Sequence, residues 1–182
     1  MDYKGAGILI YKIEDNKIYF LLGKENLVIS DKVSKGTKYK DFGGDKCISD
    51  SNYIETASKQ FYQETMGSFY SLCEMKDMLL NCSVFYNEKY KYHQFLVESD
   101  ISEQKINTYN KIRSYLTSCM QVMYQNNNIC YQKLDCPSDG YVEKSEIRWF
   151  ELNDILSNNT IFKSQFINTL MKIFTNNILQ IQ

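Results

Sequence analysis

The order of β-type and helix-type patterns in the N-terminal part of the chain most constrains the fold. The runs GAGILIYKI (5–13) and KIYFLLGKE (17–25) are rich in β-branched and aromatic residues, and the short polar segment EDN between them predicts a hairpin. A polar loop over 25–38 and a short strand over 38–42 are expected next. From Ile54 to Met66 apolar residues recur at helical spacing, with Ser51 or Asn52 as the expected cap and Gly67 closing the helix in a left-handed conformation.

The remaining patterns complete an α+β chain. A second hairpin is predicted over 78–87 and 90–99, a helix over 102–125, a strand running into a turn over 146–156, and a C-terminal helix over about 161–178. The segment 126–144 is irregular, with room for one short strand. We therefore predict a single domain over residues 1–182, with a mixed sheet flanked by helices, in the α+β class or an α-β-α sandwich.

Composition and charge exclude several classes of protein. Lys and Arg (21) nearly balance Asp and Glu (22), so any site for a polyanion must be local. No run approaches the roughly 18 apolar residues of a membrane span, and the N-terminal segment lacks the features of a secretory signal, so a cytoplasmic location is expected. The six cysteines form no C-x-x-C pair, which favours reduced thiols over a zinc site.

The stretch from Asp41 to Phe69 carries the clearest motif. Gly43 and Gly44 precede a polar loop, and the helix after it contains Ala57 and Glu64 and ends at Gly67. This pattern resembles the box of the Nudix hydrolases, G-x5-E-x7-R-E-U-x-E-E-x-G-U, where U is a bulky aliphatic residue. The resemblance implies a Nudix fold, with 146–156 as its late strand and turn and 101–145 as an insertion of mainly helical character. Viral and cellular mRNA-decapping enzymes of this family carry a helical insertion in a similar region.

Most acids of the family's box are missing from this chain. In the family, several carboxylates on one helix face hold Mg²⁺ ions that clamp a diphosphate and activate water. Alignment on Ala57 and Gly67 leaves Glu64 as the one acid of four, and the other three positions carry Asn52, Phe61 and Thr65. Gln60 replaces the motif's arginine. A single carboxylate binds Mg²⁺ poorly, so Glu64 is only a weak candidate for a metal ligand, and loss of hydrolysis is predicted.

Other acids could restore chemistry only from outside the helix. Glu55 lies on the opposite side of the helix from Glu64, at about 100° per residue. Asp45 and Asp50 lie in the loop and could reach inward. Glu143 and Glu146 precede the late strand, where some members of the family place a catalytic base. These two are the main route to an active enzyme, although a charged loop is the simpler interpretation.

The candidate ligand-binding residues follow from the same resemblance. Lys24 stands where relatives often carry a basic residue that faces phosphates, although a solvated lysine at a strand end is an equal alternative. Aromatic faces near the glycine pair could stack a base, against the alternative of core packing. The predicted ligand-binding residues are Lys24, Tyr39, Phe42, Gly43, Gly44, Phe61 and Glu64, with no confident catalytic residue except Glu64 if the protein is active.

Three functions remain open at this stage. The first is a Nudix-fold protein that binds a nucleotide-containing ligand, with an mRNA 5′ cap or RNA favoured, and needs no cofactor. The second is a Mg²⁺-dependent hydrolase acting on nucleoside diphosphate derivatives or capped RNA through Glu64. The third is a scaffold that binds a protein partner or a second copy of itself through the insertion and C-terminal helices.

Overall fold

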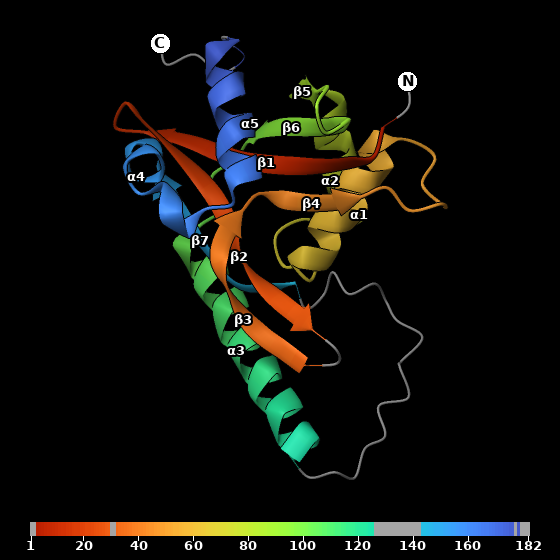
Figure 1. Cartoon of the computed structure of the whole chain (residues 1–182), viewed down its shortest axis with the longest axis vertical. Coiled ribbons are helices and arrows are strands. Elements are labelled where there is room, and N and C mark those ends of the chain that lie inside the picture. The colour runs from red at the N-terminus through yellow and green to blue at the C-terminus, as the bar shows by residue number, and fades with distance from the viewer. Residues whose placement is uncertain (1–2, 30–31, 126–142, 177, 179–182) are drawn as a thin grey trace.

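A seven-stranded mixed sheet forms the centre of the computed structural model, which describes residues 3–29, 32–125, 143–176 and 178 (Figure 1). The strands are β1 (Gly5–Glu14), β2 (Lys17–Ile29), β3 (Lys32–Lys40), β4 (Phe42–Asp45), β5 (Ser83–Asn87), β6 (Tyr92–Glu98) and β7 (Lys144–Glu151). The main order is β3-β2-β1-β6-β5, with β4 paired to β1 and β7 paired to β2. Strand β1 pairs in parallel with β6 and antiparallel with β2 and β4. The predicted mixed sheet is therefore confirmed.

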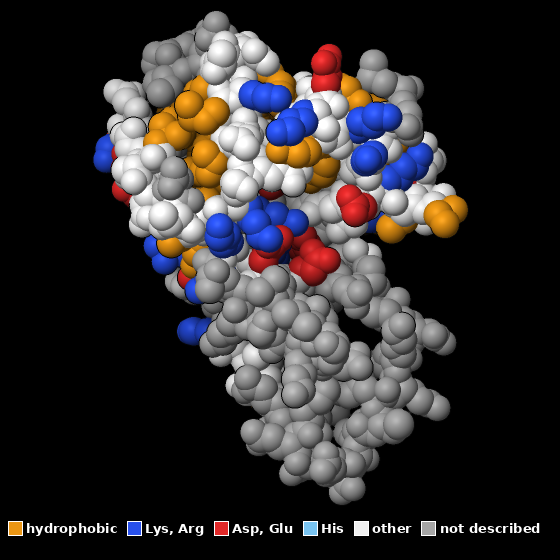
Figure 2. All heavy atoms as spheres, viewed as in Figure 1, with side chains coloured by type: hydrophobic (Ala, Val, Ile, Leu, Met, Phe, Trp, Pro, Cys, Tyr) orange, Lys and Arg blue, Asp and Glu red, His pale blue; other side chains and the backbone are white. Residues whose placement is uncertain are grey.

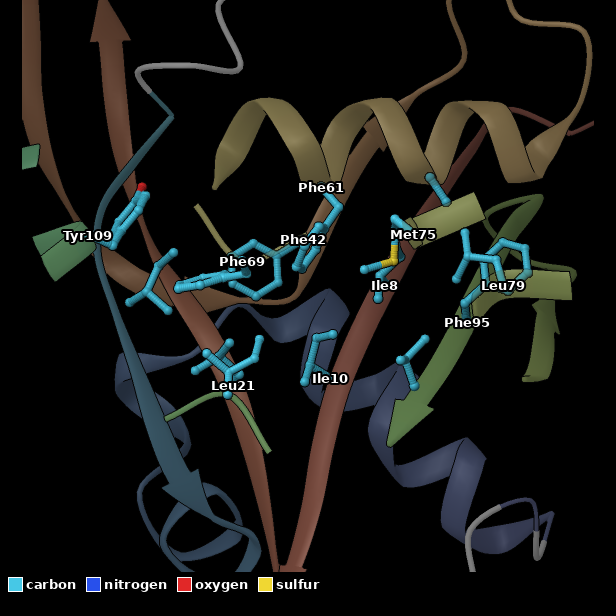
Figure 3. Packing of buried hydrophobic residues seen from close by; sticks show 14 of the residues in the cluster. Ile8, Ile10, Leu21, Phe42, Phe61, Phe69, Met75, Leu79, Phe95 and Tyr109 are labelled. Atoms are coloured by element: carbon cyan, nitrogen blue, oxygen red, sulfur yellow. The ribbon is translucent and has the colours of Figure 1, made fainter. Parts of the chain in front are cut away.

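Helices cover both faces of this sheet. They are α1 (Tyr53–Glu64), α2 (Leu72–Leu80), α3 (Glu103–Gln125), α4 (Leu152–Ser157) and α5 (Ser164–Thr175), with a short 3-10 turn at Asn159–Ile161. Alternate residues of β1 enter different cores: Ile8 and Ile10 pack with residues of α1 and α2, while Leu9 packs with residues of α4 and α5. This alternation is the period of a strand buried on both faces. Figure 3 shows the first core, in which Phe61 points from α1 toward Phe42.

The helix after the glycine pair has the predicted boundaries. Asn52 is its N-cap, because its side-chain oxygen accepts a hydrogen bond from the Glu55 N–H at 2.9 Å. Helix α1 ends at Glu64, and left-handed backbone begins at Met66 (φ 54°) and continues at Gly67 (φ 62°), so the left-handed conformation predicted for Gly67 is confirmed, one residue after the point where the helix closes. Both ends of α1 are thus determined by local sequence.

The polar loop predicted over 25–38 is wrong, because β2 and β3 form a long antiparallel hairpin there. Lys24 pairs with Tyr39 and Ile29 pairs with Lys32, with a register shift between Lys24 and Asn26. A search for apolar alternation misses such a hairpin, since its ladder consists of backbone hydrogen bonds that polar residues form equally well.

Helix α2 replaces the start of the second predicted hairpin. Ser71 and Glu74 form a capping box, in which each side chain bonds to the other residue's backbone N–H, at 3.2 and 2.8 Å. Met75 and Leu79 are buried one helical turn apart. The first strand of that hairpin consequently begins at Ser83 rather than 78, and β5 still pairs antiparallel with β6 as predicted.

The C-terminal part of the chain also differs in its boundaries. The last helix begins at Ser164 rather than about 161, and α4 forms the second half of the segment predicted as a turn over 146–156. The predicted helix over 102–125 is confirmed as α3, while the predicted irregular segment lies mostly outside the described residues. Within the described part of the chain, no helix has both the length and the apolar character needed to cross a membrane.

Candidate functional site

The glycine pair lies where β4 approaches β1 most closely. Gly43 pairs with Gly7, and a Cβ atom on Gly43 would lie 2.4 Å from the Gly7 Cα and 2.2 Å from the Tyr92 hydroxyl oxygen. Non-bonded atoms do not approach each other this closely, so a side chain at Gly43 would push the strands apart. Glycine is therefore required here for close packing of β4, β1 and the Tyr92 ring.

Glu64, the one acid retained from the motif, is fully buried at the end of α1. Its Oε2 accepts a hydrogen bond from the Gly43 N–H at 3.1 Å, which ties α1 to β4. Its Oε1 lies 3.6 Å from the Lys144 ammonium and accepts no hydrogen bond from any described residue. Glu64 thus faces an internal cation rather than solvent.

Lys144 reaches this carboxyl from the first position of β7, and its side chain is also fully buried. Its ammonium donates to the Asp41 carbonyl oxygen at 3.2 Å and lies 5.8 Å from the centre of the Phe42 ring. A Cβ atom on Gly23 would lie 2.6 Å from the Lys144 Cδ, so the missing side chain of Gly23 makes room for the lysine stem. The lysine side chain is therefore built into the core of the protein.

Helix α3 holds the backbone on both sides of this ion pair. The Tyr109 hydroxyl donates to the Glu64 carbonyl at 2.9 Å and lies 3.4 Å from the Lys144 carbonyl. Arg113 Nε donates to the same Lys144 carbonyl at 2.7 Å. The first half of the predicted insertion is consequently part of the structure that positions the site.

Burial dominates the electrostatics of this cluster. The pKa of Glu64 is raised to about 8. Burial is the largest cause and the neighbouring Glu143 adds to it, while the charges of Lys144 and Lys40 oppose the shift. Burial lowers the pKa of Lys144, and Glu64 opposes that shift. The pKa of Asp41 is raised by burial, against the charges of Lys40 and Lys144. The carboxyls here hold protons more tightly than they would in water.

These residues do not fit a magnesium ion. Among the described residues, no group of three or more His, Cys, Asp or Glu side chains could hold a metal. The Lys144 ammonium stands beside the only motif acid and would repel a second cation. Asp50 is 6% exposed and bonds Thr56 and Lys59, while Glu55 bonds Ser51 and Lys59, so both acids are engaged elsewhere.

A pocket of 640 Å³ lies beside the glycine pair. Its wall includes Gly43 and Gly44, the turn between β5 and β6, and the N-terminal part of α5. Figure 2 shows lysine and acidic side chains gathered side by side on this face. The charged residues that line the pocket are Lys4, Glu25, Lys40, Asp41, Asp45, Glu88, Lys89, Lys91, Glu143 and Lys163. The aromatic ones are Tyr90, Tyr92 and Phe166.

Similarity to known proteins was found in the comparison of structures and not in the comparisons of sequence. No family model matches it, and no curated protein matches it in sequence. This chain is similar to solved structures of Nudix proteins.

An Ap4A hydrolase from C. elegans in a binary complex is 14% identical, with 96% of this chain and 98% of that chain covered and a TM-score of 0.49. A mutT/nudix family protein from Listeria innocua is 12% identical, with 97% and 95% covered and a TM-score of 0.47. The Nudix domain of Shewanella oneidensis NrtR, crystallised with ADP ribose, is 9% identical, with 97% and 88% covered and a TM-score of 0.48.

Four of the predicted ligand-binding side chains lie away from the pocket. Phe42 and Phe61 are fully buried against each other, with ring centres 5.2 Å apart, and present no free face (Figure 3). Tyr39 is buried against Phe150 and donates its hydroxyl to Glu146 at 2.9 Å. Lys24 lies over the Tyr39 ring at 5.7 Å. Gly43 and Gly44 line the pocket, and Glu64 lies beneath Gly43.

The late-strand acids separate in the structure. Glu143 lines the pocket and lies beside Glu64, whereas Glu146 bonds Tyr39.

Sequence reasoning missed Lys40, Lys163 and Lys144. Lys40 and Lys163 both pair with Glu25 at the pocket wall. Gly23, which follows the apolar residues Phe20 to Leu22 in β2, was a signal in the sequence that another side chain packs closely against the backbone of this strand.

Proposed function

We propose that this chain is a Nudix-fold protein that binds a nucleotide-containing ligand, with an mRNA 5′ cap or RNA favoured, in the pocket beside Gly43 and Gly44, and does not hydrolyse a diphosphate. The observation that carries the proposal is the Glu64–Lys144 pair. The acid that would hold a metal in an active site instead lies 3.6 Å from an internal ammonium and accepts a hydrogen bond from the Gly43 N–H.

The pocket has groups suited to each part of a nucleotide. Lys40 and Lys163 both pair with Glu25 at the pocket wall, and an ammonium group can bind a phosphate as a point charge. The half-buried rings of Tyr90 and Tyr92 could stack a base.

Thermal unfolding with a nucleotide panel tests this proposal. Cap analogue, GTP, ATP and ADP ribose are each added with Mg²⁺ or with EDTA, and products are analysed in the same samples. A ligand at 100 times its dissociation constant adds about 2.7 kcal/mol, which raises the midpoint by several degrees. We expect stabilisation that persists in EDTA and no product.

A matched pair of variants locates the ligand. Lys163→Met removes a lysine of the pocket wall and should reduce the midpoint shift, whereas Lys172→Met removes an exposed lysine of α5 outside the pocket and should leave it unchanged. Lys24→Met tests the sequence-based assignment of that residue. Equal shifts in all three variants would refute binding in this pocket.

A second candidate function rests on Glu143. A pair of adjacent carboxyls, one with a pKa of about 8, has the character of a general acid and base near neutral pH. Under this alternative the protein is a hydrolase, and Mg²⁺ would be required only in that case. Mg²⁺-dependent product that disappears in Glu64→Gln would establish it and overturn the binding-only proposal.

A third candidate rests on exposed apolar side chains of α3. Ile112, Tyr115 and Leu116 are 46%, 68% and 39% exposed, and their spacing places them on one face of the helix. Together with Met171 of α5, which is 50% exposed, they would serve a scaffold that binds a protein partner or a second copy. This function predicts an oligomer in solution and no midpoint shift with any nucleotide.

A further inference from the structure

Three lysines form a row across adjacent chain segments at the N-terminal edge of β1. The Lys46 N–H donates to the Lys4 carbonyl at 2.8 Å, and the Lys4 N–H donates to the Lys91 carbonyl at 2.8 Å. Gly5 pairs with Asp45 and with Tyr92, and the three lysines are the residues next to these in the chain: Lys4 precedes Gly5, Lys46 follows Asp45 and Lys91 precedes Tyr92. Lys4 therefore lies between the other two, and all three side chains are exposed.

Two of these lysines have no nearby carboxylate among the described residues. In the described part of the chain, no carboxylate lies within 4.0 Å of the Lys4 or Lys46 ammonium. The nearest acids along these segments are Asp45 and Glu88, which also line the pocket. A bound anion would supply Lys4 and Lys46 with the opposite charge that the described residues do not place within this distance.

Aromatic rings accompany the lysines. The Lys46 ammonium lies 4.6 Å from the centre of the Tyr3 ring, and the Lys89 ammonium lies 5.3 Å from the centre of the Tyr90 ring. Tyr3 is buried and so serves to hold Lys46 in place, while Tyr90 is half-buried and lines the pocket. Lysines beside aromatic rings are the combination found where proteins bind single-stranded nucleic acid.

The row is continuous with the pocket, because Lys4, Lys89 and Lys91 line the pocket wall. Figure 2 shows basic side chains clustered on the same face as the pocket, above its acidic residues. The chain as a whole has a net charge of −1, so this grouping of lysines is a local feature.

We propose that Lys46, Lys4 and Lys91, with Lys89, bind the phosphodiester backbone of a single-stranded RNA whose terminal nucleotide occupies the pocket. The inference rests on the proposed function and extends it, because it assigns the ligand as an oligonucleotide rather than a free nucleotide. Each lysine contacts a phosphate as a point charge, so the row contributes affinity without base specificity.

Fluorescence anisotropy with labelled RNAs of increasing length tests the row. Affinity should rise with length from a dinucleotide to an octanucleotide and then level off. Each phosphate contact contributes about −0.7 to the slope of log K against log salt for single strands. Replacing Lys4, Lys46 and Lys91 together by Gln should therefore reduce the steepness by about 2 and lower octanucleotide affinity at least tenfold in low salt.

Two controls separate the row from the pocket. Lys46→Gln alone removes a lysine that does not line the pocket, so the thermal shift with a free nucleotide should be unchanged while the salt slope falls by about 0.7. Replacing Lys105, Lys111 and Lys172 by Gln removes the same charge from exposed positions on α3 and α5 and should leave the slope unchanged.

The outcomes distinguish failure of the inference from failure of the proposed function. If free nucleotides bind and affinity does not depend on RNA length, or if both triple variants change the slope equally, the row is not an RNA site and the pocket proposal stands. If neither nucleotide nor RNA binds, both proposals are wrong. If duplex RNA competes as well as single-stranded RNA, the assignment of a single strand is overturned.

Discussion

Removal of the Lys144 ammonium gives the sharpest test of how the site is built. Lys144→Met keeps most of the volume of the buried stem and deletes the charge that faces Glu64 at 3.6 Å. The Glu64 side chain is fully buried, so water cannot replace the ammonium as its partner. In the variant it must either remain as an unpaired buried carboxylate or take up a proton.

The cost of this change depends on pH. Protonation of a carboxyl whose usual pKa is 4.5 costs about 1.4 kcal/mol for each pH unit above that value. The native protein already carries this cost below pH 8, because the pKa of its Glu64 is about 8, so Lys144→Met should lose little through Glu64 at pH 5.5 and 7. From pH 8 upward the native carboxyl ionises against Lys144, and the variant should lose up to about 3 to 5 kcal/mol, the usual cost of removing one partner of a buried pair. Glu64→Gln with Lys144→Met needs no counter-ion and should be more stable than Lys144→Met at pH 8.

The sign of the pH dependence follows from the direction of each shift. The pKa of Glu64 is raised in the folded state, so its contribution to stability is present below 4.5 and is lost as the pH rises toward about 8. The pKa of Lys144 is lowered, which gives a rise of stability with pH below 10.5 in the native protein. Lys144→Met removes this compensating slope, so its stability should fall more steeply with pH.

Urea unfolding at pH 5.5, 7 and 8 measures these quantities. Lys163→Met is the matched control, because Lys163 is 40% exposed and its pairing with Glu25 should contribute less than about 1 kcal/mol. The reasoning is refuted if Lys144→Met costs the same at every pH, or if the Glu64→Gln and Lys144→Met effects add without coupling.

Three further substitutions test the surrounding structure. Gly23→Ala places a methyl group 2.6 Å from the Lys144 Cδ and should lower the free energy of unfolding by about 1 to 3 kcal/mol, measured by urea unfolding; combined with Lys144→Ala, the loss specific to Gly23 should disappear. Tyr109→Phe removes the hydrogen bond to the Glu64 carbonyl and should cost about 1 to 2 kcal/mol, and no change in the urea midpoint would contradict the role given to α3. Asn52→Ala removes the cap of α1 and should cost about 1 kcal/mol, whereas Asn52→Asp should restore the cap in the same assay.

Local signals in the sequence predicted the local structure well. The cap at Asn52, the closure at Gly67 and the hairpin of β1 and β2 depend on residues close together in the chain. The capping box of Ser71 and Glu74 was an equally local signal, and its omission led to the missed α2. The β2–β3 hairpin was missed for a different reason, because the polar residues around Leu27, Val28 and Ile29 were interpreted as a loop although these three residues favour a strand.

The site could not be predicted from its motif alone. Lys144 is eighty residues beyond Glu64, and only the packing of β7 beside β2 brings its ammonium to the carboxyl. Lys163 reaches the pocket because α5 begins beside it, a placement that no spacing in the sequence encodes. Gly43 and Gly44 of the motif line the pocket, whereas the partners of these glycines come from distant elements.

Glu64 has contacts that differ from those of Phe61 and Thr65, its neighbours in the stretch that resembles the Nudix box. Phe61 fills the core, and Thr65 donates its hydroxyl to the Phe61 carbonyl at 2.7 Å. Glu64 has a structural task that neither residue could perform, because its carboxyl accepts the hydrogen bond of the Gly43 N–H that lies beneath the pocket. Glutamine retains an oxygen in that position, and Lys144→Met removes the ammonium that Glu64→Gln alone would leave without its carboxyl, so the double variant should keep the fold and the pocket. If the proposed binding function is correct, the double variant keeps its midpoint shift with nucleotide, and loss of the shift in a folded double variant would show that the Glu64–Lys144 pair itself takes part in function.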